Sequence, residues 1–298
     1  MVQSMENNHI QLLEMIVWSI SNLCRGKPKP GLEHLSIVIP HLCNILQSVT
    51  GEILTNACWV LVYLSDGSNA MVLQEMDSCG IFQNCASMLG QSSDPSLILA
   101  FLRILCNFVF GDTGYIHKFF NSDILELISR ALTTSTRDVR FEVCFLLSNI
   151  AEVGGQECIE LILDSPTLIY TIIEIIQSGH MDLKVEALWI VGNIAEQGSE
   201  EQLQKLVQLG MIPLLCHNVE TYDVKTILMI LDAIDNILIA GDRLGENYRL
   251  TLDEHGGVDM IESLQTYVND DVYRRAVEII DSYFGGDDSD DWDEGRSL

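Results

Sequence analysis

Positive charge is what this sequence has least of. Its 298 residues include 16 Lys and Arg against 43 Asp and Glu, which gives a formal net charge of −27. A surface this acidic repels nucleic-acid phosphates and anionic lipid headgroups, and it speeds association with basic partners. The composition therefore argues against nucleic-acid binding and favours a basic binding partner.

The sequence also lacks the spacings of metal and disulfide sites. Its nine cysteines are scattered, and none forms a C-x-x-C pair. An odd, dispersed set argues against a disulfide framework or a zinc site and indicates free, buried thiols in a reducing compartment. The seven histidines show neither H-x-x-x-H nor H-E-x-x-H spacing. Because nucleophile–base pairs and phosphate loops are missing too, we expect no enzyme, no metal and no cofactor.

Long uninterrupted hydrophobic runs are absent as well. Arg103 interrupts the apolar run at 97–110, and Asp232 and Asp235 interrupt the run at 224–241, which argues against membrane spans. The N-terminus has neither the basic nor the apolar region of a secretory signal. We therefore expect no membrane association and no secretion.

What the sequence does contain is a repeat, clearest at 186–195. On a helix, Glu186, Trp189 and Asn193 share one face, which we call a column, because they are three and four residues apart. The apolar residues between them, such as Ile190, fall on the opposite face and are expected to be buried. The pattern recurs at intervals of 41 to 44 residues, and its last residue is Asn22, Tyr63, Asn107, Asn149, Asn193 and Asn236.

Each column is followed by a glycine after four to six residues, as at Gly67 and Gly198. A helix end commonly needs a left-handed residue, so we expect that conformation at these glycines. A period in the forties with three helical patterns per unit is typical of armadillo repeats, none of which buries its apolar face alone.

The fold expected is all-α, a right-handed armadillo-repeat superhelix of about six repeats with a partial C-terminal cap. Its expected parts are a loose N-terminus (1–9), the solenoid (10–285) and a disordered acidic tail (286–298), since six of the eight residues at 287–294 are acidic. The main helices are expected at 10–24, 31–49 (a pair), 52–65, 95–110, 137–152, 181–197, 223–240, 258–266 and 270–284.

The columns suggest a reader of basic peptides. An Asn carboxamide can clamp a peptide main chain, a Trp face can take the alkyl stem of Lys or Arg, and a carboxylate can pair the cation. Two columns hold all three parts or close analogues: Glu142/Phe145/Asn149 and Glu186/Trp189/Asn193. Trp18 with Asn22 and Trp59 with Tyr63 make a weaker pair of columns. Arg103 lies between the two sets in the sequence, and its positive charge would repel a bound Lys.

Structural alternatives stand beside these assignments. Each Trp could belong to the core, and Glu142 and Glu186 could be ordinary solvated helix residues. For Arg103 we expect pairing with a neighbouring acid in the groove rather than contact with a ligand.

Three strings resemble the later repeats of the importin-alpha family: Trp18-Ser-Ile-Ser-Asn22, Ala57-Cys-Trp-Val-Leu-Val-Tyr-Leu-Ser-Asp-Gly67 and Asn247-Tyr-Arg-Leu-Thr-Leu-Asp-Glu-His-Gly-Gly-Val-Asp259. The resemblance covers nearly the whole chain. It implies an adaptor for Lys/Arg-rich nuclear localisation signals that works in the cytoplasm and the nucleus. It also implies contact between the last repeats and the export receptor.

The resemblance further implies which residues bind the signal. The minor groove would use Arg103, Asn107, Glu142, Phe145, Ser148, Asn149, Glu186, Trp189 and Asn193. The edge of the major groove would use Trp18, Asn22, Trp59 and Tyr63. Phe145 replaces the usual Trp. The family's basic importin-beta-binding segment and first repeats are not in this sequence, so importin-beta binding is not expected from this chain alone.

Two other functions remain open at this stage. One is a shortened scaffold or regulatory paralogue that competes for cargo or for the export receptor without carrying cargo. The other is a catenin-like scaffold, but such scaffolds need a basic groove and these columns are acidic.

Overall fold

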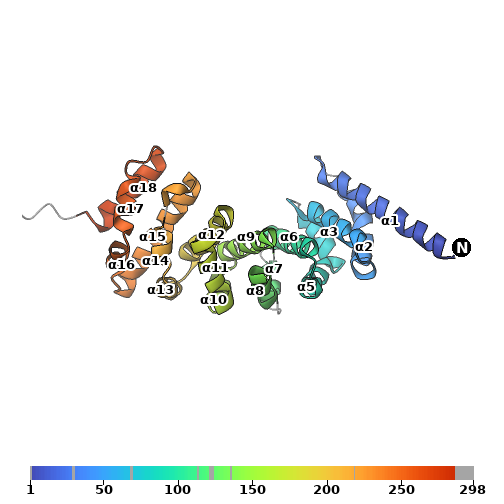
Figure 1. Ribbon diagram of the computed structural model, residues 1–298, viewed down its shortest axis with the longest axis horizontal. Coiled ribbons are helices and arrows are strands. Elements are labelled where there is room, and N and C mark those ends of the chain that lie inside the picture. Colours follow the sequence, from blue (N-terminus) through green and yellow to red (C-terminus); the bar gives the residue numbers. More distant parts are fainter. Residues whose placement is uncertain are drawn as a thin grey trace, which may run out of the picture. The chain divides into compact units, whose positions relative to one another are not determined.

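The computed structural model of the protein describes residues 2–28, 31–67, 70–112, 114–120, 124–134, 136–217 and 219–285. Over this part of the chain every regular element is helical, and Figure 1 labels the helices in order. The chain divides into two compact units, Met1–Cys158 (unit 1) and Ile159–Leu298 (unit 2), and each is described by itself. The expected acidic tail at 286–298 lies outside the described residues.

The boundary between the units falls inside helix α10. Up to and including α10 the helices are α1 (Val2–Arg25), α2 (Leu32–Ser48), α3 (Glu52–Ser65), α4 (Ala70–Ser78), α5 (Ile81–Gln91), α6 (Pro95–Gly111), α7 (Gly114–Phe120), α8 (Ile124–Thr134), α9 (Arg137–Val153) and α10 (Gly155–Leu163). After it come α11 (Pro166–Ser178), α12 (Met181–Gln197), α13 (Glu200–Gln208), α14 (Met211–Leu215), the 3-10 helix η1 (Val219–Thr221), α15 (Val224–Leu244), α16 (Tyr248–Glu254), α17 (Gly257–Leu264) and α18 (Asp270–Tyr283).

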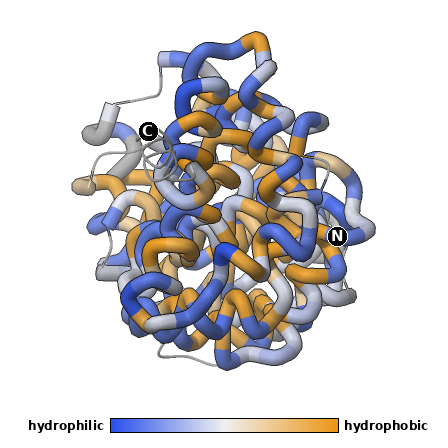
Figure 2. Tube along the Cα trace, turned by 90° about the vertical axis from the view of Figure 1, so that its left-hand side faces the viewer, coloured by the Kyte–Doolittle hydropathy of each residue, from blue (hydrophilic) through white to orange (hydrophobic). Residues whose placement is uncertain are grey.

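The helices that carry the columns pack in series within each unit. In unit 1, α1 packs on α3, α3 on α6 and α6 on α9. In unit 2, α12 packs on α15, and α15 packs in turn on α18, which carries no column. The apolar face of α12 is buried as the pattern predicts, with Ala187, Ile190 and Ile194 at 0% exposure. Figure 2 shows the matching alternation of hydrophobic and hydrophilic residues along the trace. Burial of these stripes is the main driving force for the stacking.

Helix starts follow local side-chain chemistry. The Asp94 carboxylate accepts the backbone N–H of Ser96 at 2.9 Å, and Pro95 occupies the first turn of α6. Asp223 likewise accepts the N–H of Thr226 at 3.1 Å at the start of α15. Such caps satisfy donors that have no partner inside the helix, and Pro fits there because its missing N–H costs nothing.

Three expected helices differ from the structure, and one of them is α15, which ends at Leu244 rather than at residue 240. Helix α1 begins at Val2 rather than at residue 10, and the residues before 10 include no Gly or Pro to stop it. The expected pair at 31–49 is a single helix, α2, with Pro40 inside it. The helix continues past the proline because Ile39 and Leu42 on its two sides belong to one buried face.

The glycines that follow the columns serve two different purposes. Gly67 and Gly155 have positive φ, 59° and 71°, as expected for left-handed residues. The expectation is wrong for Gly26 and Gly198, whose φ is not positive and is −75° at Gly198, where α12 ends. It is also wrong for Gly111 and Gly241, which lie inside α6 and α15. At Gly111 a Cβ would stand 2.2 Å from Leu73 Cδ1, and at Gly241 it would stand 2.7 Å from the ring of the tyrosine in α16. These two positions need a small residue because neighbouring helices approach closely.

All nine cysteines are free thiols, and eight of them are buried. Burial raises the pKa of Cys58 and of Cys216 to about 12. Such thiols remain protonated near neutral pH and behave as small apolar side chains. Among the described helices, none combines the length and the apolar content that a bilayer crossing requires.

Candidate functional site

The aromatic residues of the columns lie outside the core. Trp18 on α1 exposes 60% of its surface and Phe145 on α9 exposes 40%. Trp59 on α3 and Trp189 on α12 are half-buried. The core interpretation of these rings is therefore wrong, and each has surface that a ligand can contact.

The residues predicted for the minor groove divide between the two units. Unit 1 holds Arg103, Asn107, Glu142, Phe145, Ser148 and Asn149, and unit 2 holds Glu186, Trp189 and Asn193. The residues predicted for the major groove, Trp18, Asn22, Trp59 and Tyr63, all belong to unit 1. The two sets are therefore described unit by unit.

In unit 1 a side chain of the protein already covers the ring of Trp59. The Arg103 Cζ lies 5.5 Å from the centroid of that ring, a distance at which guanidinium and indole attract. Tyr63 stands one turn further along α3, with its ring centroid 6.0 Å from that of Trp59. A basic ligand at Trp59 must therefore displace an arginine.

Arg103 is held from a second side by Glu142. Its Nε donates to Glu142 Oε2 at 2.8 Å, which confirms the expected pairing with a neighbouring acid. Glu142 is only 5% exposed, so the interpretation as a solvated surface residue is wrong for it. Burial raises the pKa of Glu142, and the Arg103 guanidinium opposes that rise. A hydrogen bond to a charged group contributes about 1.5–3 kcal/mol and a cation–π contact about 0.5–2 kcal/mol, so Arg103 is held from two sides.

The carboxamides of the unit 1 columns are already engaged within the protein. Asn22 Nδ2 donates to Trp18 O at 3.0 Å, and Asn149 Nδ2 donates to Phe145 O at 2.7 Å. Asn107 Nδ2 reaches across to α3, where it donates to Ser65 Oγ at 2.9 Å. Each of these nitrogen atoms carries two N–H groups. Asn107 Nδ2 and Asn149 Nδ2 each contact two acceptors within the protein, so a peptide that uses them replaces an existing contact and gains only the difference between two bonds.

Ser148 is more buried than Phe145, the aromatic residue of the same column helix. It is 6% exposed, and its hydroxyl donates to Phe145 O at 2.9 Å. In unit 2, Asn193 is also buried, at 7% exposure, while Glu186 is half-buried on the same helix as Trp189. Of these residues, Trp189 and Glu186 present the most surface to a ligand.

A cavity of about 470 Å³ lies next to Trp189 in unit 2. Its walls come from the column helices α12 and α15 and from α18, and they combine apolar with charged side chains. The lining residues are Trp189, Gly192, Glu196, Lys225, Leu228, Met229, Asp232, Ala233, Asn236 and Arg275. Glycine is required at 192, because a Cβ there would stand 2.2 Å from Met229 Sδ.

Two cations at this cavity come from the protein itself. Lys225 Nζ lies 4.8 Å from the centroid of the Trp189 ring. Arg275 on α18 donates to Asp232 Oδ1 at 2.7 Å and to Asp235 Oδ2 at 2.6 Å, both on α15. Asp232 is the residue that the sixth column carries in place of an aromatic ring, and its charge is used to hold α18 to α15.

Sequence reasoning missed both of these cations. Neither belongs to a column. Lys225 reaches the cavity from α15, which packs on the α12 helix of Trp189, and Arg275 reaches it from α18, which packs on α15. The interruption of the apolar run by Asp232 and Asp235 was the signal for Arg275, since two acids on a packed helix need a cationic partner. Lys225 left no such signal.

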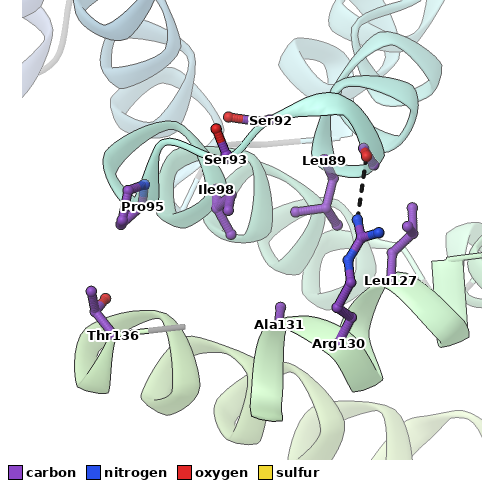
Figure 3. A pocket seen from close by; sticks show the side chains of 10 residues that line it. Leu89, Ser92, Ser93, Pro95, Ile98, Leu127, Arg130, Ala131 and Thr136 are labelled. Atoms are coloured by element: carbon purple, nitrogen blue, oxygen red, sulfur yellow. Dashed lines mark hydrogen bonds between the residues drawn. The ribbon is translucent and has the colours of Figure 1, made fainter. Parts of the chain in front are cut away.

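A second cavity, of about 420 Å³, lies in unit 1 away from all the predicted residues. Figure 3 shows it between the α5–α6 connection and helix α8. Arg130 extends from α8, and its Nη2 donates to Gly90 O at 3.2 Å (Figure 3). The remaining walls are mainly small or aliphatic, such as Ile98 and Ala131. This bond joins neighbouring repeats, so we assign Arg130 a structural role.

Two family models match parts of the sequence. The Armadillo/beta-catenin-like repeat matches residues 36–66, and the Atypical Arm repeat matches residues 246–296. Solved structures agree on the fold. A designed armadillo repeat protein, solved in complex with the peptide (KR)4, superposes with a TM-score of 0.71 at 22% identity and covers 82% of this chain and 99% of that one. An engineered protein gives a TM-score of 0.75 at 20% identity and covers 91% of this chain and 64% of its own.

Similarity to natural proteins extends over almost the whole chain. Importin subunit alpha-3 of Arabidopsis thaliana is 33% identical over 295 residues, which are 96% of this chain and 55% of that protein. Importin subunit alpha-1b of Oryza sativa subsp. japonica is 31% identical over 96% of this chain and 54% of its own length. The chain thus spans about half the length of the relatives that it matches. Its helices, its repeat period and these relatives make it an armadillo-repeat protein, an α-solenoid, homologous to the importin alpha subunits.

Proposed function

We propose that the chain binds Lys/Arg-rich peptides in extended form along its column helices, and that it acts in nuclear import as an adaptor for nuclear localisation signals. The observation that carries the proposal is the placement of the four column rings outside the core, each with an amide or phenol one turn further along its helix. The net charge of −27 supports a basic ligand. The importin subunits alpha among the relatives, and the (KR)4 peptide bound to the designed repeat protein, support the same ligand class.

Within unit 2 the binding position that we favour is the face of Trp189, with Glu186 one turn before it. The indole is half-buried, and the cation over its ring, Lys225, is itself exposed. A Lys or Arg side chain packed on the ring gains a cation–π energy of about 0.5–2 kcal/mol from its charged group, and a nearby carboxylate adds a salt-sensitive attraction. In unit 1, Trp18 and Phe145 are the rings that Arg103 leaves uncovered.

The proposal is tested by titrating the full chain with a labelled (Lys-Arg)4 peptide and following fluorescence anisotropy. We expect Trp189→Ala and Glu186→Arg each to weaken binding by more than about 1 kcal/mol, a factor of five or more, because a ring face or an opposite charge is lost. Affinity should fall steeply as salt is raised.

Tyr170→Ala is the matched control for the ring variant. Tyr170 is an exposed aromatic of unit 2, at 63% exposure, but it lies on α11 rather than on a column helix. Its removal should leave the affinity unchanged. Equal titrations for wild type, Trp189→Ala and Glu186→Arg would remove this assignment, and preferential binding of a Glu-rich peptide would favour a catenin-like scaffold instead.

The family resemblance also suggests a role for the last repeats. We propose that the region from α15 to α18, which the Atypical Arm repeat model partly covers, contacts the export receptor. A shortened regulatory form that competes for cargo would bind the same peptides. It would differ in failing to deliver a fluorescent cargo that carries the signal to nuclei in permeabilised cells.

A further inference from the structure

A lysine of the same chain, Lys225, lies over the ring of Trp189. Lys225 Nζ lies 4.8 Å from the ring centroid. This is the position that the ammonium group of a bound peptide lysine would take. Lys225 is exposed, and the cavity of about 470 Å³ lies directly beside the contact. The ammonium therefore has both solvent and open space into which it can move.

The local chemistry of α15 gives no reason for a lysine at this place. Lys225 is the second residue of the helix, where the positive end of the helix dipole disfavours a cation. The first turns of α12, α13, α17 and α18 hold acids at this end instead. The carboxylate of the N-cap, Asp223, is turned to the helix end, where it accepts the N–H and the hydroxyl of Thr226. The contact with the Trp189 ring thus offsets the unfavourable interaction of the Lys225 ammonium with the helix dipole.

Lys225 is held on its ring less firmly than Arg103 is held on Trp59. Arg103 stacks on Trp59 and is anchored to the buried carboxylate of Glu142 by an ion pair of 2.8 Å. For Lys225 the cavity offers two acids, Glu196 and Asp232, but Asp232 is already bound by Arg275. Arg103 blocks the ring of Trp59 to a ligand. Lys225 covers the ring of Trp189 by a contact that a ligand cation can replace.

We propose that Lys225 is an internal, displaceable ligand of Trp189 that competes with a basic side chain of the bound peptide and so lowers the affinity of this position. The proposal rests on the proposed function, since competition requires that a basic peptide binds at Trp189. When a peptide cation takes the ring, the Lys225 ammonium moves toward solvent and the Glu196 carboxylate at the cavity wall. The lysine thereby sets the threshold that a signal must exceed to occupy this position.

The test is the affinity of the full chain for the labelled (Lys-Arg)4 peptide in wild type and in Lys225→Gln. We expect Lys225→Gln to bind two- to fivefold more tightly, because the peptide no longer displaces a cation. The gain should vanish in the Lys225→Gln/Trp189→Ala double variant when it is compared with Trp189→Ala, since the contested ring is then absent.

Lys184→Gln is the matched control, because it removes the same charge from α12. Lys184 Nζ donates to Gln177 O, and Lys184 does not line the cavity. An equal gain in peptide affinity in this control would show that the effect comes from the change in net charge, and it would overturn the proposal. Unchanged or weaker binding by Lys225→Gln, with wild type binding normally, would overturn it alone. Absence of binding in wild type and in Lys225→Gln would overturn the proposed function and this proposal together.

Discussion

Replacement of Arg103 by methionine tests how the middle of unit 1 is held together. Methionine retains an unbranched apolar stem against Trp59 but removes the partner of Glu142. The Glu142 side chain is 7% exposed, while the Arg103 side chain is 43% exposed. Loss of one partner from a fully buried pair costs about 3–5 kcal/mol, and a hydrogen bond to a charged group is worth about 1.5–3 kcal/mol. Because the pair is half open to water, we expect a loss of stability of about 2–3 kcal/mol.

The cost should depend on pH in a definite direction. Burial already raises the pKa of Glu142 above its usual value, and loss of the guanidinium raises it further. The penalty is present while the carboxyl is ionised, above its pKa in the folded variant. It disappears as the pH falls below its pKa in the folded wild type, where both proteins bury a neutral acid. Wild type and variant should therefore converge as the pH is lowered from about 8 toward 4.

The assay is urea unfolding of the full chain, followed by hydrogen exchange of amides in α6 and α9, because a repeat protein with two units need not unfold in one step. Glu142→Gln supplies the second background for a double-mutant cycle. In that background Arg103→Met should cost less than 1 kcal/mol, since no buried charge is left unpaired. An equal cost in both backgrounds, or one that does not change with pH, would refute the reasoning.

Two further predictions concern the C-terminal helices and the thiols. Tyr283 donates its hydroxyl to Asp235 at 2.6 Å, so Tyr283→Phe should lower stability by about 1 kcal/mol and increase hydrogen exchange in α18; unchanged exchange would show that the bond contributes nothing. Burial raises the pKa of Cys58 to about 12, so a thiol reagent at about pH 8 should modify the half-exposed Cys79 first and reach Cys58 only on unfolding. Peptide mass mapping of the labelled native protein would reveal the opposite order.

Much of the fold was predictable because the repeat constrains it at every period. Helices α3 and α12 occupy 52–65 and 181–197, as expected, since their apolar stripes and flanking turns agree. The errors have particular physical causes. A pair of helices was expected at 31–49, yet packing of the residues on both sides of Pro40 keeps α2 continuous. The short helix α16 was missed because its seven residues are too few to show a period.

The candidate site was predictable to a lesser degree. Column spacing predicted rings on the face opposite the buried stripe, and the acidic neighbours of Arg103 predicted its pairing with a carboxylate. Spacing along one helix cannot predict contacts made by side chains of a helix packed against it, such as Lys225 on Trp189 or Arg275 on Asp232. It also cannot predict that the amide nitrogens are already engaged, because those bonds depend on side-chain rotamers.

The central claim is that indole faces of the column helices receive the cations of a basic peptide. The most direct test is NMR of the indole N–H signals, assigned by single Trp→Phe variants, during titration with unlabelled (Lys-Arg)4. We predict that the signal of Trp189 shifts to saturation with the affinity measured by anisotropy, while that of Trp59, which Arg103 covers, moves little. Binding of the peptide with no change in the Trp189 signal would contradict the account.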